Sequence, residues 1–219
     1  MPRLWAITPP SGPLIADTVA LWCQAGTATD VGLWLRTPGE SPTRTLERCA
    51  GLVGRARTAG IAIVLGAPIA AIEEAAAVVR AWGLQGLVLR ADPNAAALGQ
   101  ARACLGPEAW LGRSTHAAAM DHDQCTMTVL GPIYAPHTPK PVATAALGLQ
   151  ALGLAAMAPG ARIIAVGGVD RAHANACVAS GAWGLAGIRS FFGDAEQVVE
   201  DVGALRLALQ LANHGPTSP

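Results

Sequence analysis

The sequence predicts an α/β fold, a single (β/α)8 TIM barrel, on two observations. Short apolar runs with the length of strands recur eight times along the chain, and alanine-rich stretches with helical spacing lie between them. Eight strand–helix units in about 200 residues fall at the lower end of the size range of such barrels. A flavodoxin-like open sheet is the alternative, but it needs only about five strands.

The expected strands are continuous apolar segments. They cover residues 4–8, 31–36, 61–66, 86–90, 110–115, 126–132, 162–168 and 183–189. Apolar runs of this kind are typical of parallel strands that are buried on both faces of the sheet. The segments therefore indicate strands that helices cover on the outside.

Two segments show how the helices are expected to pack and to begin. In residues 68–83, apolar and charged side chains separate onto two faces of a helix. The apolar face holds Ile69, Ile72, Ala76 and Val79, and the charged face holds Glu73 and Arg80. Asp194 is a suitable N-cap for the long helix that ends the folded part of the chain.

The composition excludes several classes of protein. Of the 219 residues, 52% are hydrophobic and 14% charged, which is enough apolar material for a large core. The formal net charge is zero, so no basic surface points to nucleic acid. The apolar runs are shorter than the roughly 18 residues of a membrane span, and the N-terminal segment has no long apolar core typical of a signal peptide. We expect a cytoplasmic protein with one domain, residues 1–213, and a flexible tail, residues 214–219.

The cysteines do not form a recognisable framework. They are five in number and widely spaced, with no CxxC pair: Cys23, Cys49, Cys104, Cys125 and Cys177. This pattern argues against both disulfides and a zinc site. We expect them to be small apolar residues of the interior.

The active site of such a barrel lies at the C-terminal ends of its strands. Reactive or charged side chains that follow the first five expected strands are Thr8, Arg36, Thr37, Glu40, Arg90, Asp92, Arg113, Ser114, Thr115 and His116. The loop after the sixth strand, GPIYAPHTPKP, contains Tyr134, His137, Thr138 and Lys140. Lys140 is the single lysine of the sequence, beside 14 arginines.

The loops after the last two expected strands predict a phosphate site. In these barrels they often bind phosphate through backbone N–H groups. Gly167 and Gly168 allow the close approach of backbone to a phosphate, and Ile188, Arg189 and Ser190 lie at the end of the neighbouring strand.

Three further groups of titratable residues have more than one interpretation. Asp92 either caps a helix that begins at Asn94 or acts as a weak ligand for Mg²⁺. His116 is either an ordinary residue at the start of the next helix or a ligand-binding or proton-transfer group. The acidic cluster at residues 121–123 falls at the opposite end of the barrel, where we do not expect a metal site, and His173 is expected to be solvated.

Several motifs together resemble one family. They are GRSTH (112–116), GPIYAPHTPKP (131–141) followed by LGLQAL, IIAVGGV (163–169) and ASGAWGLAGIRSFF (179–192). In order and spacing they are similar to the thiamine phosphate synthase superfamily, which includes the thiazole tautomerase (TenI) branch. The synthase joins hydroxymethylpyrimidine pyrophosphate to thiazole phosphate, with Mg²⁺ on the pyrophosphate.

The resemblance implies roles for individual positions. It places Arg36 and Ser114 on the pyrophosphate, Thr138 and Lys140 in a loop that closes over the substrates, and Gly168 and the backbone of Ile188 on the thiazole phosphate. Lys140 would then bring a positive charge to a phosphate on a flexible side chain.

The positions that would hold the metal depart from the family pattern. Gly66 and Ala67 stand where the family has an Asn-Asp pair. Pro93 falls at the second metal-binding Asp, with Asp92 one position away. Fewer carboxylates weaken Mg²⁺ binding, and pyrophosphate departure depends on charge neutralisation.

Other positions depart from the two branches. Pro38 replaces a lysine of the synthases, Arg189 replaces a serine, and Pro132 replaces a histidine of the tautomerases. In a tautomerase, His116 or His137 would have to act in place of the missing histidine. Lys140 is the third candidate catalytic residue. The motifs LWAIT and GRSTH are slightly more similar to the tautomerase branch.

These observations predict a protein of thiamine biosynthesis that binds a phosphorylated thiazole or pyrimidine. We expect it to be tautomerase-like or catalytically weakened, with a doubtful requirement for Mg²⁺. An active thiamine phosphate synthase and a non-catalytic ligand-binding or regulatory barrel are the alternatives. No membrane or nucleic-acid partner is expected, and the sequence leaves the oligomeric state open.

Overall fold

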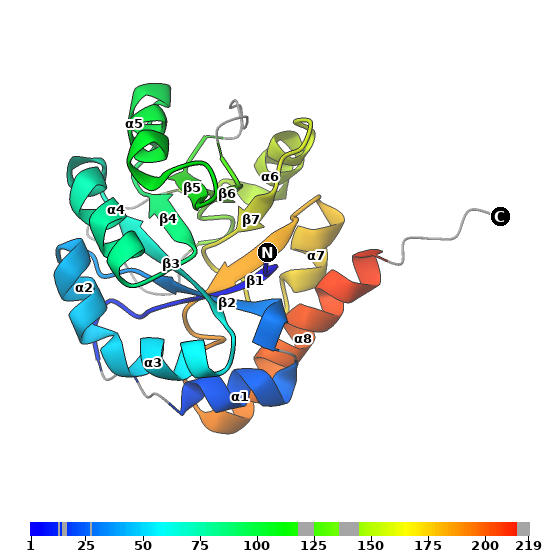
Figure 1. Ribbon diagram of the computed structural model, residues 1–219. Helices are drawn as coiled ribbons and strands as arrows, with labels where there is room; N and C mark the ends of the chain where they lie inside the picture. Colours follow the sequence, from blue (N-terminus) through cyan, green and yellow to red (C-terminus); the bar gives the residue numbers. More distant parts are fainter. Residues whose placement is uncertain (13, 15–16, 27, 118–124, 136–144, 214–219) are drawn as a thin grey trace.

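Eight parallel strands close into a barrel in the computed structural model, in the order β1 to β8, with β8 paired to β1 (Figure 1). The structure describes residues 1–12, 14, 17–26, 28–117, 125–135 and 145–213. The TIM barrel prediction is confirmed, and the open-sheet alternative is wrong because an open sheet would leave β1 and β8 unpaired.

Each predicted apolar run corresponds to one strand, and the third strand ends at Ala67, one residue beyond its run. The strands are β1 Leu4–Ile7, β2 Val31–Leu35, β3 Ala62–Ala67, β4 Gly86–Leu89, β5 Trp110–Thr115, β6 Met127–Leu130, β7 Ile163–Ala165 and β8 Gly184–Gly187. The seventh run is trimmed most, because the chain leaves the ladder in the glycine turn that begins after Val166.

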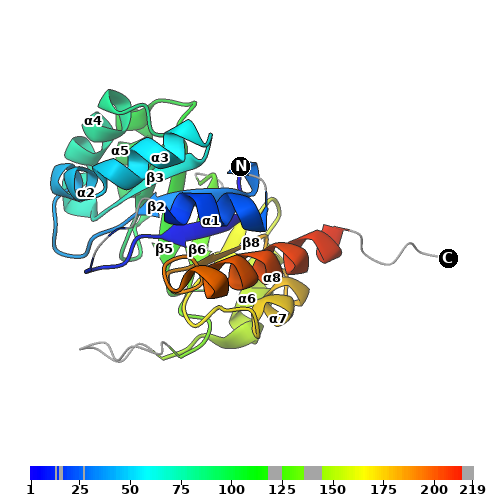
Figure 2. The same ribbon diagram turned by 90° about the horizontal axis from the view of Figure 1, so that it is seen from below.

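Helices surround the strands. They are α1 Thr18–Ala25, α2 Pro42–Arg48, α3 Ala50–Thr58, α4 Ile72–Ala81, α5 Ala95–Leu105, α6 Gly148–Ala156, α7 Ala174–Ala179 and α8 Ala195–Asn213, with 3-10 turns η1 Ala28–Asp30 and η2 Ile69–Ala71. Asp194 caps α8 as predicted, accepting hydrogen bonds from the backbone N–H groups of Glu196 and Gln197. Helices α1 and α8 lie side by side, so the two ends of the folded chain meet (Figures 1 and 2).

The expected apolar face of residues 68–83 needs one correction. Ile72, Ala76 and Val79 are buried, but Ile69 is 39% exposed. The reason is that α4 begins only at Ile72, and Ile69 belongs to the 3-10 turn η2, which does not continue the helical face.

Two apolar layers form the core. An inner layer fills the barrel with Trp5, Ile7, Trp34, Val64, Val88, Met127, Val129, Ile164 and Ala186. An outer layer packs the other strand faces against the helices. Gly32 makes room for the inner layer, because a Cβ there would lie 2.6 Å from the ring of Trp5. Burial of each large side chain stabilises the fold by roughly 1.5–3 kcal/mol.

The expectation of buried cysteines holds for Cys49 and Cys177, whereas Cys23, Cys104 and Cys125 are only partly buried. None of the five forms a disulfide, as predicted. Burial is the largest influence on the thiols of Cys49 and Cys177 and raises the pKa of each to about 11, so neither is a reactive thiolate at neutral pH. Among the described residues, no helix has the length and apolar character needed to cross a membrane.

Candidate functional site

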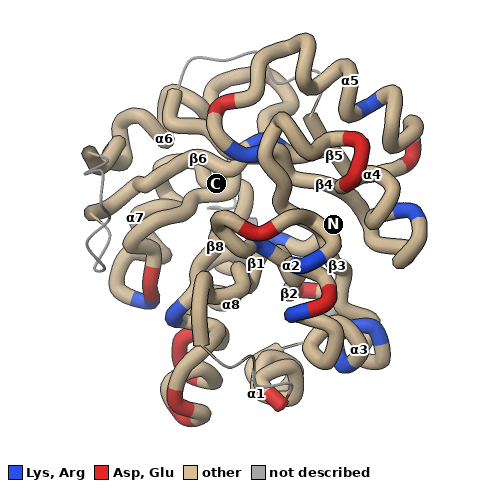
Figure 3. Tube along the Cα trace, turned by 90° about the vertical axis from the view of Figure 1, so that its left-hand side faces the viewer, with Lys and Arg blue, Asp and Glu red and all other residues tan. Residues whose placement is uncertain are grey.

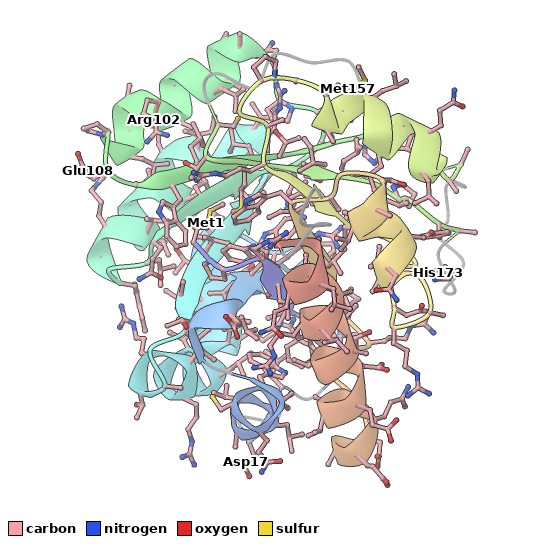
Figure 4. All side chains as sticks on the ribbon, turned by 90° about the vertical axis from the view of Figure 1, so that its right-hand side faces the viewer. Met1, Asp17, Arg102, Glu108, Met157 and His173 are labelled. Atoms are coloured by element: carbon pink, nitrogen blue, oxygen red, sulfur yellow. The ribbon has the colours of Figure 1, made fainter. Side chains whose placement is uncertain are left out.

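The carboxyl ends of the strands mark the mouth of the barrel. His173, labelled in Figure 4, lies in the loop that follows β7 and therefore at the mouth. Met1, before β1, and Glu108, before β5, precede their strands and belong to the opposite end of the barrel. The predicted site residues follow the strands and therefore belong to the end marked by His173.

The turn after β7 is built from glycines with left-handed backbone. Gly167 has φ 87° and Gly168 has φ 64°. A Cβ on Gly168 would lie 2.6 Å from Cβ of Tyr134, so a larger residue fits neither the backbone angle nor the space. The turn is held by the N–H of Tyr134, which donates to the carbonyl oxygen of Gly167 at 3.0 Å.

The turn after β8 lies beside it and presents backbone donors. The carbonyl oxygen of Ile188 accepts hydrogen bonds from the N–H groups of Phe191 and Phe192. The N–H groups at the start of this turn, in Arg189 and Ser190, have no backbone acceptor among the described residues. The side chain of Ser190 is buried and bonds to Asp201 of α8, so it holds the turn in place while Arg189 is exposed. Free N–H groups at the start of a turn favour an anion.

An Asp–His pair lies between the ends of β4 and β5. Nδ1 of His116 is 2.7 Å from Oδ2 of Asp92. Oδ1 of Asp92 accepts from the hydroxyl of Thr115 at 2.9 Å and from the backbone N–H of His116 at 2.7 Å. Burial acts to raise the pKa of Asp92, but the hydrogen bonds from His116 and Thr115 outweigh it and lower that pKa.

The backbone that directs Asp92 toward His116 is strained. Ala91 has φ 66° and Asp92 has φ 53°, angles that residues with a Cβ adopt at a cost. The expectation that Asp92 caps the next helix is wrong. Asn94 caps α5 through Oδ1, which accepts from the N–H of Ala97 at 2.9 Å. Asp92 is thus free to hold the histidine.

Arg36 and Ser114 lie where the sequence placed them, at the ends of β2 and β5. The hydroxyl of Thr8 accepts from the N–H of Arg36 at 2.8 Å and donates to its carbonyl oxygen at 2.9 Å, which fixes this backbone. Trp34 faces the barrel interior, so strand alternation directs Arg36 inward as well. Arg90 was among the rim residues but was given no role. Strand alternation could have identified Arg90 as a site residue, because it lies two residues after Val88, which faces the barrel interior.

Other rim residues are engaged with one another. Glu40 lies 3.8 Å from Nε of Arg48, whose Nη2 donates to the hydroxyl of Thr37 at 3.2 Å. His173 is half-buried instead of solvated, because its ring stacks on Tyr134 with centroids 3.9 Å apart. Asp170 is 2.9 Å from Nδ1 of His173.

Some predicted residues lie outside the described part of the chain. They are His137, Thr138 and Lys140, the acidic cluster at 121–123 and the tail at 214–219. Their proposed roles stay predictions.

Residues 19–191 match the family model described as thiamine monophosphate synthase. The chain belongs to this family. The match covers most of the chain and includes both glycine-turn loops and the Asp92–His116 pair. Among proteins with curated descriptions, none matches the chain.

Solved structures share the barrel. Thiamine phosphate pyrophosphorylase from Pyrococcus furiosus has a TM-score of 0.74 and 16% identity, covering 96% of both chains. A structure described as native KDPGal has a TM-score of 0.67 and 18% identity, covering 96% of both chains. TrpF from Jonesia denitrificans has a TM-score of 0.64 and 17% identity, covering 97% of this chain and 98% of its own. At these identities the likeness shows the fold.

Mg²⁺ is the metal that the thiamine monophosphate synthase family implies, and the described residues do not fit a carboxylate-held ion. Both oxygens of Asp92 already accept hydrogen bonds. Gly66 and Ala67, at the end of β3, bring no ligand. In the described part of the chain, no three His, Cys, Asp or Glu side chains gather closely enough to hold a metal ion. The neighbouring guanidinium groups of Arg36 and Arg90 repel a cation.

Proposed function

We propose that this member of the thiamine monophosphate synthase family is an isomerase of the thiazole tautomerase kind. It would bind a thiazole phosphate and move a proton within the ring system without a carboxylate-held metal. The observation that carries the proposal is the Asp92–His116 pair, with Nδ1 and Oδ2 2.7 Å apart at the barrel mouth.

The pair has the arrangement that proton transfer requires. An imidazole whose Nδ1 donates to a carboxylate keeps Nε2 as an acceptor, so the tautomer is set by the partner. The His116 side chain is 47% exposed, so a ligand can reach it. In a tautomerisation, Nε2 would accept a proton from one ring position and return it to another, so that no electron or group leaves the substrate.

The glycine turn after β7 and the turn after β8 support binding of the phosphate end. Gly168 brings backbone close to the mouth, and the N–H groups of Arg189 and Ser190 supply donors. A ligand held there by its phosphate would extend its ring toward the other strand ends, where His116 lies.

The synthase alternative is less well supported by the residues. Its chemistry needs neutralisation of a departing pyrophosphate, normally by carboxylate-bound Mg²⁺. The oxygens of Asp92 already accept three hydrogen bonds, which makes this carboxylate a poor ligand for a metal. The non-catalytic alternative would leave the pairing of Asp92 with His116, on strained backbone, without a use.

The test is exchange of ring protons of thiazole phosphate tautomers in deuterated water, followed by NMR in the presence of a chelator. We expect the protein to catalyse exchange and His116→Gln to slow it by about 10²–10⁴-fold, the usual contribution of general acid–base catalysis. Glu108→Gln, at the other end of the barrel, is the control and should keep full activity.

The same preparation distinguishes the alternatives. Turnover of hydroxymethylpyrimidine pyrophosphate with thiazole phosphate only when Mg²⁺ is added would support the synthase. Tight binding of thiazole phosphate with no exchange and no coupling would support a non-catalytic barrel. Exchange that persists unchanged in His116→Gln would refute the role of the pair.

A further inference from the structure

Helix α8 carries a buried carboxylate on its apolar face. The face that packs on the barrel has Val198, Val202 and Leu205, each at most 2% exposed. Asp201 belongs to the same face, because it lies three residues after Val198 and four before Leu205. Its side chain is 7% exposed, and it is the one buried carboxylate among the residues that the structure describes. Burying a carboxylate without partners is costly, so the partners of Asp201 indicate what it does.

The partners of Asp201 come from two segments at the mouth of the barrel. The hydroxyl of Ser190, in the turn after β8, donates to the carboxylate. Nε of Arg171, in the loop after β7, lies 3.6 Å from Oδ1 of Asp201. One carboxylate of α8 therefore contacts both of the segments to which the proposed function assigns the phosphate end of the ligand.

These two segments also lie against each other. A Cβ on Gly187, the last residue of β8, would lie 3.7 Å from the carbonyl oxygen of Val169, in the loop after β7. Asp170 tightens that loop, because its Oδ1 accepts from the N–H of Ala172 at 2.9 Å and from the N–H of His173 at 3.1 Å. Figure 3 shows acidic and basic segments close together where α7 and α8 are neighbours. The long helix α8 thus supports both segments from outside the barrel.

The ionised form of Asp201 is costly in this place. Burial is the largest influence on its pKa and raises it, and the charges of Asp170 and Glu200 act in the same direction. Arg171 and the hydroxyl of Ser190 act against this, but Nη1 of Arg171 is also 2.6 Å from Oε2 of Glu200. With a raised carboxyl pKa, stability is higher when the group is protonated and falls as the pH rises through the raised value, so the charge costs stability at neutral pH. A carboxylate kept at a cost to the fold indicates a use in the neighbouring site.

We propose that Asp201 is a positioning residue for the phosphate end of the ligand. Through Ser190 it fixes the turn after β8, so that the N–H groups of Arg189 and Ser190 are held ready for an anion, and through Arg171 it joins this turn to the loop after β7. The role rests on the proposed function in one respect, the binding of phosphate at these segments. Asp201 acts through Ser190 and does not touch the ligand, because a carboxylate in contact with phosphate would repel it.

Two substitutions separate the position of the turn from the charge of the carboxylate. Asp201→Asn and Asp201→Leu both remove the negative charge and are similar in size, but only the asparagine keeps an oxygen that can accept from Ser190. In calorimetry, we expect Asp201→Leu to bind thiazole phosphate roughly three- to tenfold more weakly than Asp201→Asn, the effect of about one hydrogen bond. The dephosphorylated alcohol should bind to both variants alike. Equal affinity of the two variants for thiazole phosphate would overturn the proposal.

Ser190→Ala tests the same contact from its other side. It should weaken thiazole phosphate by the same factor when combined with Asp201→Asn, and it should have no further effect when combined with Asp201→Leu, because both changes break one bond. A loss of the same size in both combinations would mean that Ser190 and Asp201 act separately, against the proposal. If Asp201→Leu does not fold, Ser190→Ala in the wild type and in Asp201→Asn still decides, and unchanged affinity in both would overturn the role.

Two further readouts distinguish positioning from support of the fold. Asp201→Leu should raise KM for thiazole phosphate and leave the kcat of proton exchange unchanged, because His116 lies by the ends of β4 and β5, across the ring from β8. Asp201→Asn should melt at no lower temperature than the wild type at neutral pH, because it removes the cost of the buried charge. A lower melting temperature of Asp201→Asn, together with weaker binding of both the phosphate and the alcohol, would make Asp201 a residue of the fold alone and overturn the proposal.

Failure of this role is distinct from failure of the proposed function. If the wild type binds thiazole phosphate and His116→Gln loses proton exchange, but Ser190→Ala has no effect in any combination, the role of Asp201 is removed and the isomerase stays. If thiazole phosphate binds with the expected effects of Asp201→Leu and Ser190→Ala but no proton exchange occurs, the isomerase is removed and the role of Asp201 stays.

Discussion

At the mouth of the barrel, the carboxylate of Asp92 orients the ring of His116. Asp92 has left-handed backbone, and its two oxygens accept from Thr115 and from both the backbone and the ring of His116. These bonds favour the ionised form and lower its pKa although burial acts in the other direction. A carboxylate held in this way can orient a base, and the three hydrogen bonds that already engage its oxygens make it a poor ligand for a metal.

Asp92→Asn should therefore lower the kcat of proton exchange by at least about tenfold, with little change in KM. The loss is part of the contribution of the general base His116, which is about 10²–10⁴-fold. A depressed carboxyl pKa contributes stability that is present above the ordinary pKa and is lost as the pH falls through the lowered value. The variant should be less stable than the wild type at neutral pH and equally stable in strong acid. Urea unfolding at both pH values measures this. A loss of stability that is the same at both would mean that the Asp92 charge is not involved.

Lys140 supplies a second prediction at this scale, which rests on the sequence because the residue lies outside the described part of the chain. If it contacts phosphate as the family resemblance implies, Lys140→Ala should weaken thiazole phosphate by roughly ten- to a hundredfold. The dephosphorylated alcohol should bind as before, and Lys140→Arg should rescue only partly because its planar group approaches differently. Equal weakening of both ligands, measured by calorimetry, would make Lys140 a residue without a phosphate contact.

Among the elements, the turn after β7 has the sharpest steric requirement. Gly168→Ala places a Cβ within 2.6 Å of Tyr134 on backbone with φ 64°, so the turn must move. We expect thiazole phosphate binding to fall below detection by calorimetry. Gly60→Ala is a matched control, because Gly60 also has positive φ, 74°, but nothing lies within 4 Å of the added Cβ. Both variants carry the same kind of backbone strain, so only the difference between them reports the phosphate site. Equal affinity in the two would remove the glycine turn from it.

The elements themselves could be predicted from sequence, because most strands are runs of apolar residues that end close to a glycine, a proline or a charge. The glycine turn was predicted from its place after the seventh strand of an eight-strand barrel, because a glycine pair alone is also common in ordinary turns, and the structure gives both glycines a positive φ. The role of Asp92 could not be, because the segment ADPN is equally compatible with a helix cap. The positive φ angles of Ala91 and Asp92 direct the carboxylate toward His116, which lies 24 positions later in the sequence. The proximity of Arg36 to Arg90 likewise could not be predicted, because it depends on the curvature of the sheet that brings the ends of β2 and β4 to one side of the barrel.

For the whole molecule, closure of the ring depends on a contact between the two ends of the chain. β1 pairs with both β2 and β8, and α1 packs on α8 outside that junction. Trp22 of α1 is fully buried there, and its Nε1 donates to the carbonyl oxygen of Phe191 at 2.9 Å. Its ring meets those of Phe191 and Phe192 edge-on, with centroids 6.1 and 5.4 Å away. Trp22 thus joins the first helix to the turn after β8.

Trp22→Leu should lower the free energy of unfolding by about 3–4 kcal/mol, because it leaves a cavity and an unsatisfied carbonyl group. Trp82→Leu is the control: Trp82 follows α4 and is 39% exposed, so its loss should cost less than about 1 kcal/mol. Phe191 and Ile188 share the turn whose N–H groups we propose as phosphate donors, and the N–H of Phe191 donates to the carbonyl oxygen of Ile188 within it. Loosening of the closure should therefore reach the site as well. Thiazole phosphate should bind more weakly to folded Trp22→Leu than to Trp82→Leu. Urea unfolding and calorimetry on the same samples check both effects, and a destabilised Trp22→Leu with unchanged affinity would show that ring closure and the phosphate turn are independent.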